Sequence, residues 1–160
     1  LKPTLLLIDT QLDMAKKSVA LFMIELLNQC ITEEQCEEKL FDFIEAEILD
    51  LEISLLSPLK PIVFMLKLAD HLGVMPNGYH SKITPYLCLE QGRFVSDIGI
   101  HTSSIPVSNL LSELKSKNAV TQVDSSIRRE ALNQVIKYYQ YHITKNKKLN
   151  SVEILAELLS

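Results

Sequence analysis

A stretch near the end of the chain, residues 137–148, interleaves aromatic and cationic side chains in a pattern suited to binding. It reads KYYQYHITKNKK, and two adjacent arginines lie about two helical turns before it. Cations neutralise phosphates and release counterions, and tyrosine rings stack on unpaired bases. The pattern predicts a surface for single-stranded nucleic acid or for an acidic peptide, with these candidate residues: Arg128, Arg129, Lys137, Lys145, Lys147 and Lys148.

The spacing leaves a plainer interpretation of this stretch open. A helix would place Arg129, Asn133 and Lys137 on one face, with the apolar positions between them pointing elsewhere. The tyrosines can then be core or boundary residues, and the lysines can simply keep the surface hydrated. The sequence alone does not decide between these interpretations.

The residue types that a reactive centre needs are scarce. The four histidines do not pair at i, i+4, and the three cysteines show no C-x-x-C spacing, so neither a zinc site nor a disulfide framework is expected. Four glycines supply no phosphate-binding fingerprint, and there is no G-x-S-x-G motif. We expect a protein that is not an enzyme and that holds no metal or cofactor.

Charge is distributed unevenly between the two halves of the chain. The net charge is −4, which by itself argues weakly against nucleic acid. Residues 1–80 carry 6 basic and 13 acidic side chains, a net −7, whereas residues 81–160 carry 10 and 7, a net +3. This asymmetry is compatible with a basic face in the second half, and equally with ordinary solvated helix faces.

The elements that must position these residues are mostly helical. Hydrophobic periodicity and capping signals predict an all-α bundle of about six helices with a small β-hairpin insert at residues 74–96. The hairpin pairs residues 86–89 with 93–95 around a glycine turn. The predicted helices span about residues 11–29, 32–56, 61–72, 106–115, 124–142 and 151–159.

Two further signals concern helix boundaries and cores. Thr32 and Gln35 form a capping-box pattern that predicts the start of the second helix. In that helix the expected core stripe consists of Leu40, Ile44, Ile48, Leu51 and Leu55.

The start of the chain and its residue composition indicate its domain organisation and its cellular compartment. Residues 1–10 read as an extended lead-in from a missing N-terminal domain, because the chain begins with Leu1, and residues 11–160 form the helical domain. No apolar run approaches the roughly 20 residues of a membrane span. Reduced thiols and the lack of a signal peptide lead us to expect a cytoplasmic protein.

Four segments occur in an order that is familiar from one protein family. They are residues 13–27, 68–77, 86–94 and 148–155. They resemble segments of the bacterial recombination-repair protein RecO, most closely its Bacteroidetes form. The first resembles the first helix of the RecO C-terminal domain, and the second resembles the opening of its zinc-finger-like insert. The third resembles the strand–turn–strand of that insert, and the fourth resembles the end of the protein. The resemblance spans essentially the whole chain, but only the later two-thirds of a family member.

The chain departs from the family pattern in two ways. Family members typically begin with an OB-fold that carries much of the DNA binding, and here it is absent or reduced to residues 1–9. Many relatives hold zinc with four cysteines in the insert, whereas residues 74–95 contain only Cys88. No metal site is therefore carried over.

The resemblance implies a recombination mediator active in DNA repair. Such proteins bind single-stranded DNA, RecR and the acidic C-terminal tail of the single-strand-binding protein, and they help load RecA. The tail would dock in an apolar pocket with basic neighbours, and the third helix, with Lys60 and Lys67, is the expected wall. Ile62 and Val63 stand where basic residues would be expected.

A second hypothesis comes from a different class of function. The net negative charge and the acid-rich second helix are also compatible with a helical protein–protein interaction domain unrelated to DNA. Steep salt-dependent DNA binding on residues 128–148 would separate the two hypotheses.

Overall fold

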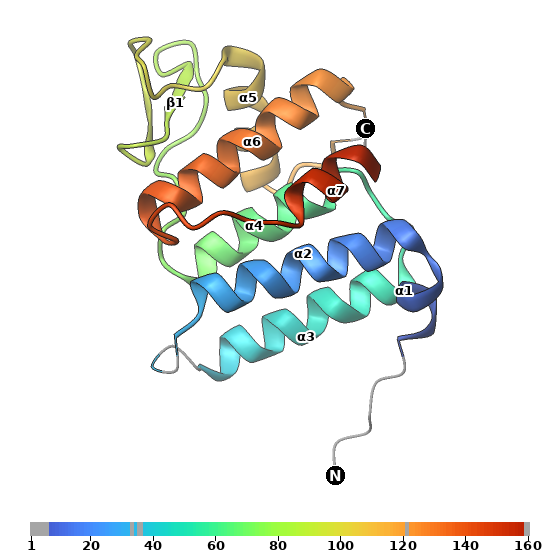
Figure 1. The fold of residues 1–160 in the computed structure, drawn as a ribbon. Helices are drawn as coiled ribbons and strands as arrows, with labels where there is room; N and C mark the ends of the chain where they lie inside the picture. Colours follow the sequence, from blue (N-terminus) through green and yellow to red (C-terminus); the bar gives the residue numbers. More distant parts are fainter. Residues whose placement is uncertain (1–6, 33, 35–36, 121, 159–160) are drawn as a thin grey trace. The chain divides into compact units, whose positions relative to one another are not determined.

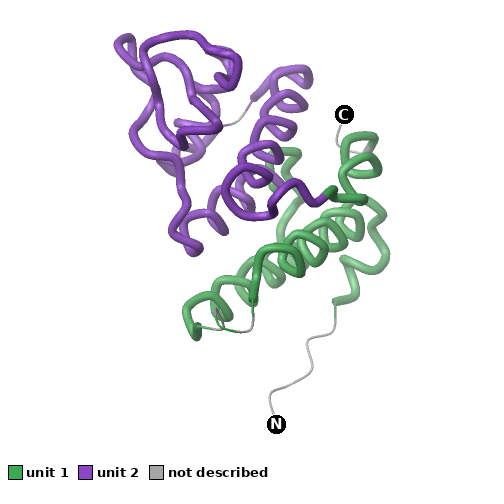
Figure 2. The backbone as a smooth tube through the Cα atoms, turned by 60° about the vertical axis from the view of Figure 1, so that its left-hand side comes forward, with its two compact units in different colours: residues 1–60, 148–160 green, residues 61–147 purple. Residues whose placement is uncertain are grey.

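The computed structural model describes residues 7–32, 34, 37–120 and 122–158 of the chain. In this part it contains seven helices and one two-stranded antiparallel hairpin, so the predicted all-α class is confirmed. The chain forms two compact units, drawn in different colours in Figure 2. Unit 1 comprises residues 1–60 and 148–160, and unit 2 comprises residues 61–147.

The described residues of unit 1 form four helices, α1 (Ile8–Leu12), α2 (Met14–Cys30), α3 (Glu38–Ile53) and α7 (Val152–Leu158). Helices α2 and α3 run side by side, and α7 packs on α2 (Figure 1). One face of α2 is buried, with Val19, Phe22 and Leu26 inaccessible to solvent. The nearly continuous apolar stretch of this helix predicts burial on every side, and that prediction is wrong, because Leu21 and Ile24 are 53% and 54% exposed.

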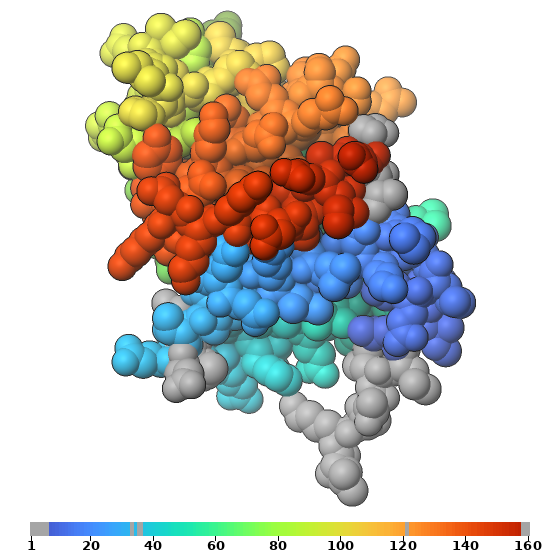
Figure 3. All heavy atoms as spheres, viewed as in Figure 1, coloured from blue at the N-terminus to red at the C-terminus, as the bar shows by residue number. Residues whose placement is uncertain are grey.

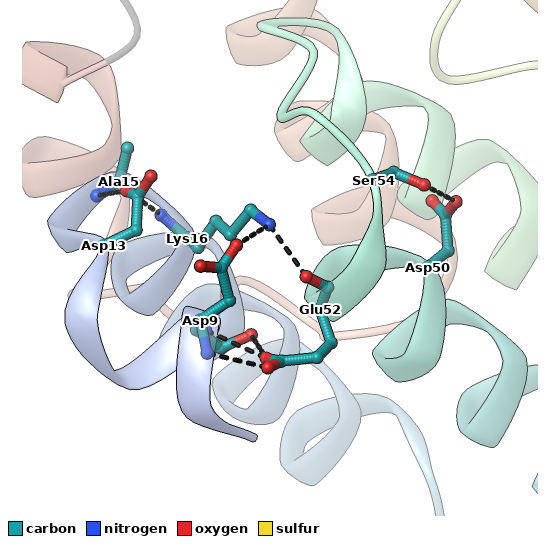
Figure 4. A network of polar contacts seen from close by, with 8 residues as sticks. Asp9, Asp13, Ala15, Lys16, Asp50, Glu52 and Ser54 are labelled. Atoms are coloured by element: carbon teal, nitrogen blue, oxygen red, sulfur yellow. Dashed lines mark hydrogen bonds and ion pairs between the residues drawn. The ribbon is translucent and has the colours of Figure 1, made fainter. Parts of the chain in front are cut away.

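The short helix α1 is held in place by a carboxylate from α3 (Figure 4). The residue before α1, Leu7, provides no side-chain cap, so the first N–H groups of the helix need another acceptor. Glu52 accepts hydrogen bonds from the backbone N–H of Asp9 (2.7 Å) and of Thr10 (2.9 Å), and from the Thr10 hydroxyl (2.7 Å). The Thr10 side chain, followed by these backbone donors, lowers the pKa of Glu52 to about 2.

The C-terminal segment is attached to α2 in a similar way. Glu25 accepts hydrogen bonds from the backbone N–H of Asn150 (2.7 Å) and of Ser151 (2.9 Å), and from the Ser151 hydroxyl. Burial alone would raise the pKa of Glu25, but the hydrogen bonds from Ser151 and Asn150 outweigh it and lower the pKa. The residues that precede α7 are therefore fixed to a helix more than a hundred positions earlier in the chain.

A buried ion pair closes unit 1 at its boundary. The Lys60 ammonium lies 2.7 Å from Glu47 Oε2 and 2.6 Å from Asp50 Oδ2. The Lys60 and Glu47 side chains are 10% and 6% exposed, whereas that of Asp50 is 52% exposed. Lys60 is therefore committed to α3 and is not a free cation at the surface.

Unit 2 contains most of α4 (Lys60–His71), strands β1 (Tyr86–Cys88) and β2 (Arg93–Val95), α5 (Ile105–Lys115) and α6 (Ser125–His142). The hairpin pairs Leu87 with Phe94 at its centre, and both side chains are buried. A ring nitrogen of His142, at the end of α6, lies 2.7 Å from the Leu89 carbonyl oxygen beside the hairpin turn. The hairpin therefore lies on α6, as a marginal two-stranded sheet requires.

Glycines with positive φ angles stand at two of the sharp turns of unit 2. Gly73 (φ 72°) ends α4, directly after the predicted helix range of residues 61–72. Gly92 (φ 65°) forms the hairpin turn, and a Cβ there would lie 3.2 Å from the Tyr138 hydroxyl. The close approach of the turn to α6 thus needs a residue without a side chain.

Three boundary and core predictions for unit 1 require correction. The extended lead-in is wrong at its end, because residues 8–10 belong to α1, while residues 1–6 lie outside the described residues. Helix α3 begins at Glu38 and not at Thr32, and the predicted partner Gln35 lies outside the described residues. Leu55 is 99% exposed, because α3 ends at Ile53 before the stripe reaches it.

Candidate functional site

The tyrosines of α6 divide into two structural ones and one exposed one. Tyr138 and Tyr139 are buried, and their hydroxyls donate to the carbonyl oxygens of Val74 and Met65. Burial raises the pKa of Tyr138 to about 12. Tyr141 is 47% exposed. Of these three rings, only that of Tyr141 is open to a ligand.

Most of the predicted cations on and after α6 are exposed. Arg129 and Lys137 are exposed on α6, and Lys145 and Lys147 are exposed in the segment that follows it. Arg128 is half-buried, and its guanidinium lies 3.5 Å from the Val123 carbonyl oxygen. Lys148 is exposed in unit 1, with its ammonium 3.6 Å from Glu153 Oε1.

The turn after α6 adopts a conformation that is uncommon for residues other than glycine. Lys145 and Asn146 have φ angles of 48° and 66°. The buried Thr144 fixes the turn, since its N–H donates to the Tyr139 carbonyl and its own carbonyl accepts from Lys147. This geometry aims Asn146 at a pocket beside α6.

That pocket, of about 280 Å³, is named here the α6 pocket. Most of its lining comes from the segment around residue 100 and from α6. In Figure 3 this segment is yellow and α6 is orange. Tyr141 and His101 hold one another, with the Tyr141 hydroxyl 2.8 Å from His101 Nδ1 and the two rings edge to face at 5.6 Å. The lining residues are Leu89, Ile100, His101, Thr102, Gln134, Lys137, Gln140, Tyr141 and Asn146.

A second pocket of unit 2, of about 400 Å³, is named here the α4 pocket. Its wall combines apolar side chains of α4 and α5 with three lysines and one aspartate. Of the predicted site residues it contains Lys67. The lining residues are Val63, Leu66, Lys67, Asp70, Met75, Tyr79, Leu114, Lys115, Lys117 and Asn118.

One of the three lysines that line the α4 pocket is bound to backbone carbonyls. The Lys115 ammonium donates to the carbonyl oxygens of Pro76 (2.5 Å) and Gly78 (2.8 Å) and lies 4.3 Å from the centre of the Tyr79 ring. Burial lowers the pKa of Lys115, against the opposing effect of the Asp70 carboxylate. Lys67 and Lys117 are exposed. These two ammonium groups can reach an anion at the pocket mouth.

The structure thus separates the predicted site residues. Lys137 lines the α6 pocket and Lys67 lines the α4 pocket, whereas Lys60, predicted beside Lys67, is sequestered in the ion pair of unit 1. Lys115 and Lys117 were missed by sequence reasoning. Their only signal is a pair of lysines flanking Ser116 at the predicted end of a helix.

The described residues contain no group of three or more histidine, cysteine or acidic side chains that could hold a metal ion. Cys30 and Cys88 are buried. Among the helices that the structure describes, none combines the length and apolar character that a membrane crossing requires.

Comparison with known proteins gives consistent matches. Residues 11–84 match the family model described as "Recombination protein O C terminal". The chain is similar to the DNA repair protein RecO of Flavobacterium psychrophilum, with 28% identity over 152 residues, covering 92% of this chain and 63% of that protein. The corresponding values are 29% over 156 residues (91% and 64%) for Bacteroides fragilis, and 26% over 158 residues (92% and 64%) for Porphyromonas gingivalis.

The chain spans less than two-thirds of the length of these curated relatives. No solved structure matches the chain.

Proposed function

We propose that this chain, whose residues 11–84 match the family model described as "Recombination protein O C terminal", belongs to the RecO family of DNA repair proteins. As such it would be a non-catalytic recombination mediator that binds single-stranded DNA and the acidic tail of the single-strand-binding protein. The observation that carries the proposal is the α4 pocket, whose wall combines apolar side chains with the exposed residues Lys67 and Lys117. An acidic tail that ends in apolar residues requires this combination.

The chemistry of the α4 pocket supports tail binding in two parts. Val63, Leu66 and Leu114 offer apolar surface for the apolar end of the tail. Lys67 and Lys117 can pair with its carboxylates, and Lys115 stiffens the wall through its bonds to backbone carbonyls. The Asp70 carboxylate opposes an acidic ligand, but three lysines outnumber it.

The basic surface of α6 and the turn after it supports DNA binding. Arg129, Lys137, Lys145 and Lys147 are exposed, and each phosphate contact releases counterions. We propose that Arg128 and Lys148 add to this electrostatic attraction. Because this electrostatic attraction is independent of base sequence, it suits a protein that must act on any single-stranded gap.

We further propose that the protein of which this chain is part binds RecR and helps load RecA onto coated single strands. No surface is assigned to RecR. We propose these two roles for the full-length protein.

The proposal can be tested by titrating a fluorescent peptide of the single-strand-binding protein tail. The unmodified chain is expected to bind it saturably, and Lys67→Glu with Lys117→Glu is expected to weaken binding by roughly tenfold or more, because two attractive contacts become repulsive. The matched control is Lys39→Glu with Lys82→Glu, which reverses two exposed lysines outside the pocket. Equal affinity in both double variants would exclude the α4 pocket as the tail site.

A further inference from the structure

The α6 pocket combines an exposed aromatic ring, a cation and several amides in one small cavity. Attraction of DNA phosphates to exposed cations does not require such a cavity. We propose that it binds one unpaired nucleobase of single-stranded DNA together with the adjoining phosphate. This inference rests on the proposed function. The proposed DNA binding involves only contacts to phosphates, and the inference adds a site for a base.

The Tyr141 ring is already positioned for stacking. Its hydroxyl is hydrogen-bonded to His101 Nδ1, and the edge-to-face contact with the His101 ring fixes its orientation. The other ring nitrogen of His101, Nε2, lies 3.7 Å from Glu90 Oε2. A ring held in this way loses little side-chain freedom when a base stacks on it.

The remaining walls match the other parts of a nucleotide. Ile100, which is 96% exposed, presents apolar surface. The amides of Gln134, Gln140 and Asn146 each offer both a donor and an acceptor, so they can satisfy the edge of any base. Binding at this site is therefore expected to tolerate every base.

Charge and size define the ligand further. The Lys137 ammonium, on the same helix as Tyr141, supplies the partner for a phosphate. The Glu90 carboxylate, next to His101 of the pocket lining, disfavours a second phosphate. A volume of about 280 Å³ lies at the lower end for small-molecule pockets, and so fits one base. A base inside a duplex has its edge paired and its faces stacked, so the pocket selects single strands.

The test compares oligo(dT) with an abasic strand of the same length, which keeps the phosphates and removes the bases. The unmodified chain is expected to bind oligo(dT) about tenfold more tightly than the abasic strand. Tyr141→Ala is expected to abolish this difference and to leave abasic binding unchanged. Tyr141→Phe keeps the ring and should retain most of the difference, although it loses the bond to His101.

Two controls make the result decisive. Phe41→Ala removes an exposed aromatic ring that lines neither pocket and should leave discrimination between the two strands intact. Matching melting temperatures show that the variants are folded. If Tyr141→Ala still prefers oligo(dT) tenfold, the pocket does not bind a base, although the proposed DNA binding stands. If the unmodified chain binds neither strand, the DNA-binding proposal and this inference fail together.

Discussion

Lys60→Ala is expected to lower the free energy of unfolding by about 3 kcal/mol, because it leaves the buried Glu47 carboxylate without the ammonium that neutralises it. Asp50→Asn should cost no more than about 1 kcal/mol, because the Asp50 side chain is half exposed. Both values are measured by urea denaturation followed by circular dichroism. A loss of 3 kcal/mol is a large share of the stability of an ordinary domain.

A double variant separates the ion pair from the volume of its side chains. Glu47→Leu with Lys60→Met replaces both buried charges by apolar groups and should stay within about 1 kcal/mol of the unmodified chain. A Lys60→Ala loss below about 1 kcal/mol would contradict the structural role assigned to Lys60.

The Lys60 contribution also has a defined pH dependence. Burial lowers the pKa of Lys60, but its hydrogen bonds to Asp50 and Glu47 outweigh burial and raise the pKa above 10.5. A raised pKa means that this stability is complete below the unfolded value and is lost only as the pH rises through the folded value. Titration of Lys60 should therefore not change the stability of the unmodified chain between about pH 6 and 9, and urea denaturation at several pH values measures this.

Lys145, Lys147 and Lys148 changed together to Ala are expected to weaken binding to single-stranded DNA uniformly across sequences, by on the order of a hundredfold at low salt. Three lost phosphate contacts should also reduce the slope of log affinity against log salt by about 2. Fluorescence anisotropy with oligonucleotides of different sequence, at several salt concentrations, measures both quantities.

The matched control for this variant is Lys17, Lys39 and Lys82 changed together to Ala. These lysines are exposed, and the change in net charge is the same. If both triple variants behave alike, the effect reflects total charge. If affinity and slope stay unchanged when residues 145, 147 and 148 are altered, the basic segment is only a hydrated surface.

The helices of unit 2 were predictable because their boundaries are set by local chemistry. Asp124 caps α6 by accepting from the Ser126 N–H, and Gly73 ends α4 with a positive φ. Helix α1 was missed because its acceptor, Glu52, comes from a different helix. A core position at Glu47 was equally hidden, since an acidic residue is buried there only because Lys60 reaches it.

The candidate site was predictable only in part for the same reason. Exposed cations such as Lys137 follow from helix periodicity, but the burial of Tyr138 and Tyr139 depends on backbone carbonyls of distant segments. The α4 pocket requires Lys67 and Lys117 to meet across 50 positions of sequence, which spacing does not predict.

The most direct measurement is a titration of the chain with labelled single-stranded and double-stranded oligonucleotides of equal length, over a range of salt concentrations. We predict tighter binding of the single strand at every salt concentration, and an affinity for it that falls steeply as salt increases. No binding of the single strand at low salt, or equal affinity for both forms, would contradict a mediator that acts on single-stranded DNA.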